Sequence, residues 1–309
     1  MLYFKIILIF FVFFSQNLKA YKVEIIAKVD QEIITNIDLK QEINYLNFLN
    51  PKLQEIKDKN KINQIAKSSI IREKIKNKEL KKLMNNKENN KISKEIEENF
   101  IKRKGFANKA EFKKKLNSLN LDYNFVIEKL KIEAMWNQLI FEKYRKQVKI
   151  NEEYLKNRLE SLIKNREKKY EYYVYEILFD IEQVKELEKK YDEIINSINL
   201  NNFSNTANIY SISNSANFGG EIGWVKETQF SKEILNEIKS LKNKELSKPL
   251  RTPAGYLIIM YDKKKSIEEF FDKKKELDYL KKFENNRQLN QFSLIYFKRL
   301  KKNSVIYEY

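Results

Sequence analysis

The chain of 309 residues contains no cysteine and no histidine. Without cysteine it can form no disulfide, no thiolate nucleophile and no lipid-modified N-terminal cysteine. Without either residue type, the usual zinc ligand sets and the Ser-His or Cys-His catalytic relays are also excluded. A metal would need a site made of oxygen ligands alone, and no loop spaces carboxylates for one. We therefore expect no metal and no cofactor.

Glycine and proline are scarce, with five and three residues respectively. Four of the five glycines fall in two short phrases, Phe218-Gly-Gly-Glu-Ile-Gly-Trp224 and Leu246-Ser-Lys-Pro-Leu-Arg-Thr-Pro-Ala-Gly-Tyr256. In so glycine-poor a chain, this clustering marks backbone positions that cannot tolerate a Cβ atom. The two phrases are the most informative local pattern in the sequence.

Acidic residues are outnumbered, since 61 lysines and arginines face 43 aspartates and glutamates, for a net charge of +18. Such an excess can indicate a nucleic-acid or anionic-membrane partner. Here the lysines are spread through every segment, usually near an acidic residue, and form no basic stripe with interleaved aromatics. We expect no nucleic-acid partner. A basic protein that binds anionic surfaces remains an alternative.

Long apolar runs are limited to the N-terminus, where Lys5 precedes the run Ile6 to Phe14 and a polar stretch ends at Ala20. This layout is typical of a secretory signal peptide that is cleaved after Ala20. The run is too short to span a bilayer, which needs about 20 apolar residues. The sequence predicts an exported chain that starts at Tyr21 and is not inserted in the membrane. An uncleaved anchor that begins at Leu2 is the alternative, and it also leaves the remainder outside the cytoplasm.

The segment after the signal peptide is predicted to open with a hairpin and to continue as helices. Residues 23–34 alternate and are rich in β-branched side chains, with a turn at Asp30-Gln31. Thr35 and Asp38 form a capping-box pattern, and Pro51 ends the helix that they begin. Caps and apolar spacing predict further helices at about 62–84, 92–105, 108–119, 122–144 and 151–168, the last being a charged connecting arm.

From Tyr170 the pattern changes to mixed strands and helices. We expect strands at 172–179, 224–225 and 256–262, with helices at 184–198, 203–210 and 231–241. These elements describe an α+β unit of about 95 residues. A long helix or a broken pair follows over 267–300. The final strand-like Val305-Ile306-Tyr307 is too short to stand alone, and the N-terminal hairpin offers it an edge.

The two glycine phrases resemble those of the parvulin family of peptidyl-prolyl isomerases, in which a Gly-Gly turn enters a strand and a Ser-x-Pro-x-x-Thr-x-x-Gly-Tyr run leads into the last one. Together with the phrase Ile33 to Leu39, the order of elements resembles the SurA-type periplasmic chaperones. The resemblance implies an α+β architecture: a helical chaperone module, built from the N-terminal helices plus the C-terminal helix and strand, with one inserted parvulin-like βα3βαβ-type domain. The expected divisions are 1–20 signal peptide, 21–168 helical region, 169–265 parvulin-like domain and 266–309 completing the module.

The resemblance also implies where an isomerase site would lie. The family's proline pocket falls on Ile222, Phe230 and Ile234, which could equally be core residues, and Trp224 and Tyr256 are expected to contact the peptide. Two positions carry hydroxyl groups, namely Thr252 and, where the family has Cys or Asp, Ser213. The two family histidines fall on Glu176 and Leu257, so their hydrogen-bonded pair cannot form. We expect Glu176 to point outward or to pair with a lysine, with Tyr175 and Tyr256 as replacement polar groups.

Isomerisation of an X-Pro bond needs no covalent chemistry, only an apolar pocket and polar groups that favour the twisted amide. With the histidine pair absent, we predict a periplasmic SurA-like chaperone that binds unfolded outer-membrane or secreted chains and carries a degenerate isomerase site. A catalytically active isomerase that uses Ser213, Thr252 and tyrosines is the first alternative. A basic protein of lipid or nucleic-acid surfaces is the second. The oligomeric state stays open.

Overall fold

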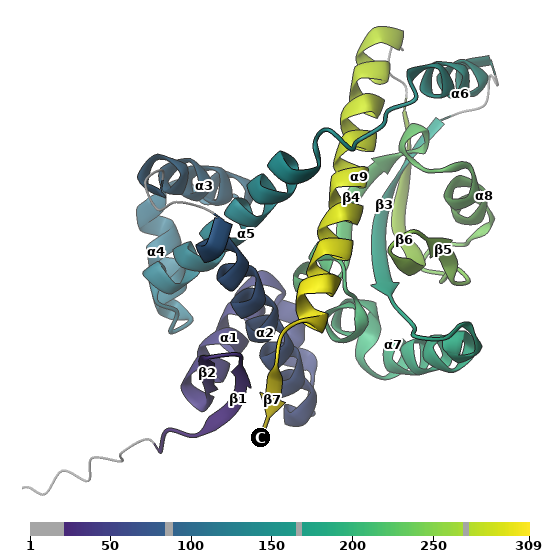
Figure 1. The fold of residues 1–309 in the computed structure, drawn as a ribbon. Helices are drawn as coiled ribbons and strands as arrows, with labels where there is room; N and C mark the ends of the chain where they lie inside the picture. Colours follow the sequence, from purple (N-terminus) through teal and green to yellow (C-terminus); the bar gives the residue numbers. More distant parts are fainter. Residues whose placement is uncertain (1–21, 84–88, 165–168, 268–271) are drawn as a thin grey trace, which may run out of the picture.

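The computed structural model describes residues 22–83, 89–164, 169–267 and 272–309, so the expected signal peptide lies outside the described residues. Within these ranges, no helix is both long enough and apolar enough to cross a membrane. Figure 1 shows helices gathered around a small sheet at one side and a larger sheet with its own helices at the other. We call residues 22–164 and 272–309 the terminal module, and residues 169–267 the central unit.

The small sheet joins the two ends of the chain. Strands β1 (Ile25–Val29) and β2 (Glu32–Thr35) form the expected hairpin, and Asp30 adopts a positive φ of 53° at its turn. Strand β7 (Ile306–Glu308) pairs antiparallel with β1, so the sheet has the order β2-β1-β7. The predicted pairing of the C-terminal strand with the N-terminal hairpin is confirmed.

The helices of the terminal module follow the predicted caps. Thr35 and Asp38 form the expected capping box at the start of α1, and Asn108 and Asp122 cap α4 and α5. Helix α1 ends at Leu49, and after the cap residue Asn50 a short 3-10 helix begins at Pro51. The elements are α1 (Asn36–Leu49), η1 (Pro51–Glu55), α2 (Lys59–Leu83), α3 (Asn89–Arg103), α4 (Lys109–Ser118), α5 (Tyr123–Tyr144) and α6 (Glu152–Lys164).

A buried charge cluster holds three of these helices in register. The ammonium group of Lys129 on α5 lies 2.6 Å from a carboxylate oxygen of Glu42 on α1 and also pairs with Glu73 on α2. Lys76 on α2 lies 2.7 Å from Glu133 on α5. Removing one partner of such a buried pair would leave an uncompensated charge, so these contacts restrict how the helices can slide.

The C-terminal helix α9 (Lys273–Lys302) is a single helix, so the alternative of a broken pair is wrong. Its inner face completes the core of the terminal module. The indole nitrogen of Trp136 donates to the Ser293 hydroxyl at 2.8 Å, and the Trp136 ring stacks on Tyr296 with 5.6 Å between the ring centroids. Figure 1 shows α9 running between the N-terminal helices and the larger sheet.

The central unit is built on a four-stranded antiparallel sheet of order β4-β3-β6-β5. Strand β5 was not predicted because it has only three residues. The predicted helices before the glycine turn meet at Asn202, whose φ of 65° is not helical. The elements are β3 (Lys169–Phe179), η3 (Val184–Glu186), α7 (Leu187–Tyr210), η4 (Asn214–Phe218), β4 (Glu221–Lys226), η5 (Glu227–Gln229), α8 (Lys232–Ser240), β5 (Leu250–Thr252) and β6 (Gly255–Ile267).

The two faces of this sheet pack against different helices. The α8 face carries Tyr172, Val174, Leu178, Leu257 and Ile259, which form one core cluster with Leu235 and Ile238 of α8. The opposite, α7 face carries Ile177, Phe179 and Ile258, which pack with residues of α7. Because side chains alternate along a strand, neighbouring residues of β3 or β6 serve different cores.

We expect β7 to stabilise the terminal module. Its Ile306 packs on the cluster of Ala27, Val29 and Ile34. Deletion of residues 306–309 should lower the free energy of unfolding by about 2–4 kcal/mol, because it exposes this cluster and the edge of β1. Urea unfolding monitored by Trp136 fluorescence, in a Trp224→Phe background, measures the change.

The matched control is Tyr307→Thr, which keeps the strand and removes a side chain that is 56% exposed. It should change the free energy of unfolding by less than about 0.5 kcal/mol. An unchanged urea midpoint in the deletion variant would show that β7 adds nothing to the module.

Candidate functional site

The two positions equivalent to the family histidines lie together on the α8 face. Glu176 is opposite Ile259, and Leu257 is opposite Leu178, so Glu176 and Leu257 are diagonal neighbours on adjacent strands. Leu257 is buried in the core cluster, whereas Glu176 is half-buried. The structure therefore brings the predicted pair of positions together, with a carboxylate at one and an alkyl group at the other.

A row of serines supplies the partners of Glu176. Ser215 donates to a carboxylate oxygen of Glu176 at 2.9 Å, and the Ser215 and Ser213 hydroxyl oxygens lie 2.5 Å apart. Ser211 is 3.0 Å from Ser213 and accepts from the backbone N–H of Leu178 at 3.1 Å. The expectation that Glu176 points outward or pairs with a lysine is wrong, because the loop after α7 places hydroxyl groups against it. The spacing Ser211-x-Ser213-x-Ser215 was the sequence signal for this row.

The glycine turn positions β4 against this row. The backbone N–H of Glu176 donates to the carbonyl of Gly220 at 2.8 Å. Gly220 has a φ of 77°, and a Cβ atom there would lie 2.3 Å from the carbonyl oxygen of Glu176. Only glycine can bring the turn so close to β3.

The environment of Glu176 shifts the pKa of its carboxyl group. Burial raises the pKa of the Glu176 carboxyl, and the hydroxyl groups of Ser215 and Ser213 act in the opposite direction by hydrogen bonding to the charged form. The carboxyl group of Glu176 is therefore harder to ionise than that of a solvent-exposed glutamate.

The predicted hydroxyl and apolar residues are only partly gathered around this point. Thr252 closes the β5–β6 turn, donating to the carbonyl of Gly255 at 2.9 Å and accepting from the N–H of Ala254 at 3.2 Å. Phe230 belongs to the α8-face cluster, and Ile234 packs against it. Ile222 lies outside that cluster and is 46% exposed.

The two aromatic residues predicted to contact the peptide lie on the α7 face. The Trp224 ring packs edge-on against Tyr173, with 5.3 Å between centroids. Tyr256 stacks near Phe179 at 6.0 Å. Tyr175, offered as a replacement polar group, is also on this side, where it packs on Phe203. None of these three rings shares a face with Glu176.

Helix α9 covers part of the α8 face. Leu294 packs against the cluster that contains Phe230 and Leu257. Lys298 lies 3.4 Å from the carbonyl oxygen of Ala254 and pairs with Asp180. Sequence reasoning did not identify Leu294, because nothing in its local pattern distinguishes it from the other apolar residues of a long helix.

Comparison with known proteins identifies the central unit. Residues 176–263 match the family described as "Rotamase: PPIC-type PPIASE domain". The chain contains a parvulin-type domain. It is also 24% identical over 161 residues to the chaperone SurA of Methylococcus capsulatus, an alignment that covers 48% of this chain and 35% of that protein. The chain thus spans about a third of the length of the curated relative that it matches.

Solved structures give further similarities. The crystal structure of a PpiC-type isomerase domain is 21% identical and covers 33% of this chain and 96% of its own, with a TM-score of 0.29. PrsA of Bacillus subtilis is 18% identical, and the match covers 90% of this chain and 92% of PrsA, with a TM-score of 0.29. One of two related SurA-like chaperones of Campylobacter jejuni is 16% identical, and the match covers 92% of this chain and 98% of that chaperone, with a TM-score of 0.36.

The raised pKa of Glu176 predicts how stability depends on pH. Above the folded pKa the buried carboxylate destabilises the fold, and this penalty disappears as the pH falls through the folded pKa toward the unfolded value of about 4.3. Glu176→Gln keeps an acceptor for Ser215 and cannot ionise. We expect it to be more stable than the wild type at pH 7 and to approach it near pH 4, measured by urea unfolding at both values.

Glu182→Gln provides the control, because Glu182 is exposed on the loop after β3. It should change the free energy of unfolding by less than about 0.5 kcal/mol at either pH. A Glu176→Gln variant that is less stable than the wild type at pH 7 would contradict the assigned direction.

Proposed function

We propose that the protein is an exported chaperone that holds unfolded polypeptides, with its parvulin-type domain serving as a binding unit and not as an efficient isomerase. The observation that carries this proposal is a row of three side chains across the small sheet whose two outer members are apolar and exposed, and which we call the apolar row. Ile33 and Tyr307 are both paired with Lys28 on the central strand, and they are 49% and 56% exposed. Exposed apolar side chains gathered on one surface mark a site for apolar partners.

The backbone of the same sheet supports this proposal. Strands β2 and β7 lie at its two edges, and within the described residues neither pairs with a further strand. An extended client can add a strand to such an edge while its side chains meet the apolar row. We propose that the clients are outer-membrane and secreted chains whose strands alternate apolar and polar residues. The signal-peptide pattern of residues 1–20 agrees with this proposal.

A working isomerase is the second candidate, and the match to the rotamase family favours it. Against efficient catalysis stand the chemistry and packing of the family-equivalent positions. Leu257 offers no hydrogen bond, Thr252 is engaged in its own turn, and Leu294 packs over the cluster. A twisted amide is favoured only by polar groups held at fixed positions. We therefore infer that this domain retains peptide binding and has lost efficient catalysis.

Client holding should depend on the apolar row. We expect Ile33→Ser/Tyr307→Ser to weaken the capture of an unfolded β-rich protein about tenfold, since burial of large side chains is worth about 1.5–3 kcal/mol each when complete. Light scattering of the aggregating client at increasing chaperone concentration measures the effect. Holding by the wild type should persist at 0.5 M salt, whereas binding driven by charge alone should collapse.

The matched control is Val184→Ser/Leu200→Ser, which removes two residues of the central unit that are 72% and 78% exposed. It should hold the client as the wild type does. Equal loss in both double variants would mean that general surface hydrophobicity, and not the small sheet, captures the client.

Isomerase activity of the whole chain should stay close to the uncatalysed rate, which has a time constant of tens to hundreds of seconds. Ser213→Ala should change nothing, because that hydroxyl is buried within the serine row. Leu294→Ala tests whether α9 alone suppresses activity. A protease-coupled assay on an X-Pro peptide measures all three proteins. Fast isomerisation that Ser213→Ala abolishes would establish the enzyme, and activity released by Leu294→Ala would mean that the chemistry is intact but covered.

A further inference from the structure

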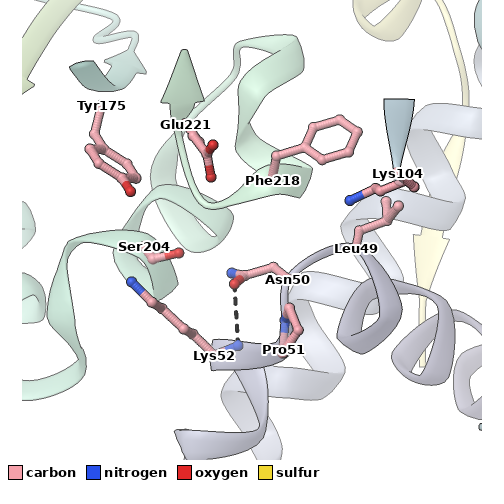
Figure 2. Close-up of a pocket in the computed structure, with 9 residues that line it drawn as sticks. All are labelled: Leu49, Asn50, Pro51, Lys52, Lys104, Tyr175, Ser204, Phe218 and Glu221. Carbon is pink, nitrogen blue, oxygen red and sulfur yellow. Dashed lines mark hydrogen bonds between the residues drawn. The ribbon is translucent and has the colours of Figure 1, made fainter. Parts of the chain in front are cut away.

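A cleft of about 450 Å³ lies between the terminal module and the central unit (Figure 2). It borders the sheet face opposite that of Glu176, because Tyr175, the preceding residue of β3, is part of its lining. One wall is the corner between α1 and η1, together with Lys104, which follows α3. The other wall comes from β3, α7, η4 and β4 of the central unit. The lining residues are Leu49, Asn50, Pro51, Lys52, Lys104, Tyr175, Ser204, Phe218 and Glu221.

Buried polar contacts hold the two walls together. Asn50 is 5% exposed, and its amide donates to the side-chain oxygen of Asn208 at 2.7 Å. The amide of Asn208 donates in turn to the carbonyl of Ala216 at 2.6 Å. Gly219 leaves the room that this arrangement needs, because a Cβ atom there would lie 1.8 Å from the Ser204 hydroxyl oxygen. These contacts fix the position of the two walls, so the cleft is a defined part of the interface between the terminal module and the central unit.

The polar groups of the cleft favour an anion. Lys52 extends toward Ser204 and Tyr175, and Lys104 reaches in from the opposite side (Figure 2). Neither ammonium group forms an ion pair with another residue of the described ranges, and Lys104 lies 5.3 Å from the centre of the Phe218 ring. The one carboxylate in the lining, Glu221, accepts from the Tyr173 hydroxyl. Two cations and one anion leave the cleft with a net positive charge.

The apolar part of the lining favours a peptide over a bare ion. Leu49, Pro51 and the rings of Tyr175 and Phe218 give the cleft surface that an inorganic anion would not contact. A volume of this size accommodates a short segment of chain. Desolvation lowers the pKa of Lys104, while Glu221 opposes the shift, and an added carboxylate would favour the charged ammonium in the same way.

We propose that this cleft binds an acidic segment of an extended polypeptide. The carboxylate of an Asp or Glu side chain would lie between Lys52 and Lys104, and a neighbouring apolar side chain would pack on Tyr175 or Phe218. This proposal rests on the proposed function, since it adds a charge preference to the holding of unfolded chains. In addition to its contact with the small sheet, the client would contact the cleft, which borders the face of the central sheet opposite the family-equivalent isomerase positions.

The test uses the full chain and three fluorescent nine-residue peptides that share one Phe and differ only in the preceding residue, which is Asp, Asn or Lys. Fluorescence anisotropy at 50 mM salt should show the Asp peptide binding about tenfold more tightly than the Asn peptide, and the Lys peptide most weakly. Lys52→Gln/Lys104→Gln should remove the preference for Asp. Glu221→Gln should tighten binding of the Asp peptide about threefold, because it removes the competing carboxylate and keeps an acceptor for Tyr173.

Lys185→Gln/Lys189→Gln is the matched control, since both lysines are exposed on the central unit away from the cleft and the net charge changes equally. It should keep the preference for Asp, and thermal unfolding checks that every variant is folded. If the Asp and Asn peptides bind alike, or if both double variants lose the preference equally, the acidic-segment proposal is overturned and client holding stands. If competition shows that inorganic phosphate at millimolar concentration displaces the Asp peptide and binds equally well, the cleft is an anion site only. Failure of the wild type to bind any peptide or unfolded protein would overturn both proposals.

Discussion

The packing of Trp136 against α9 is the contact on which the rest of the structure depends. Its indole nitrogen donates to Ser293 and its ring stacks on Tyr296, so helices that precede and follow the central unit in the sequence share one core. The central unit is consequently tethered at both of its ends, where β3 begins and where β6 leads back to α9 (Figure 1). This double attachment lets α1 and η1 meet α7 and β4 in a defined way, and the cleft exists because of it. A unit attached at one end only would be free to move relative to the terminal module, so its side of the cleft would not be held in place.

The two faces of the central sheet have different relations to solvent. On the α8 face, Leu257, Phe230 and Leu294 form a packed core, and the carboxylate of Glu176 accepts a hydrogen bond from Ser215. On the α7 face, the sheet and α7 border the cleft with the terminal module. Polar groups in a packed core contribute to stability through satisfied hydrogen bonds, whereas those beside an open cleft remain available to a ligand. This difference is why we assign holding, and not rapid isomerisation, to the chain.

Much of the fold follows from local chemistry and could be predicted. Thr35, Asn108 and Asp122 cap helices because their side-chain oxygens accept from backbone N–H groups that have no other partner. The glycine phrase at 218–224 indicated a turn that approaches a neighbouring strand, and Gly220 lies against the carbonyl of Glu176. The two helices predicted before the glycine turn are present and meet at the kink at Asn202. Strand β5 was not predicted, because three residues are too few to show a periodic pattern.

The sequence by itself determined the elements, the resemblance to parvulins and the absence of a histidine pair, because each depends on residues close together in the chain or on residue types alone. Only the tertiary structure decided which side chains meet. It separated Trp224 and Tyr256 from Glu176, since side chains alternate across a sheet, and it supplied Ser215 as the partner of that carboxylate. It also brought Lys52 and Lys104 to one cleft. Their proximity arises from the packing of α1, α3 and the central unit, and no local spacing records it.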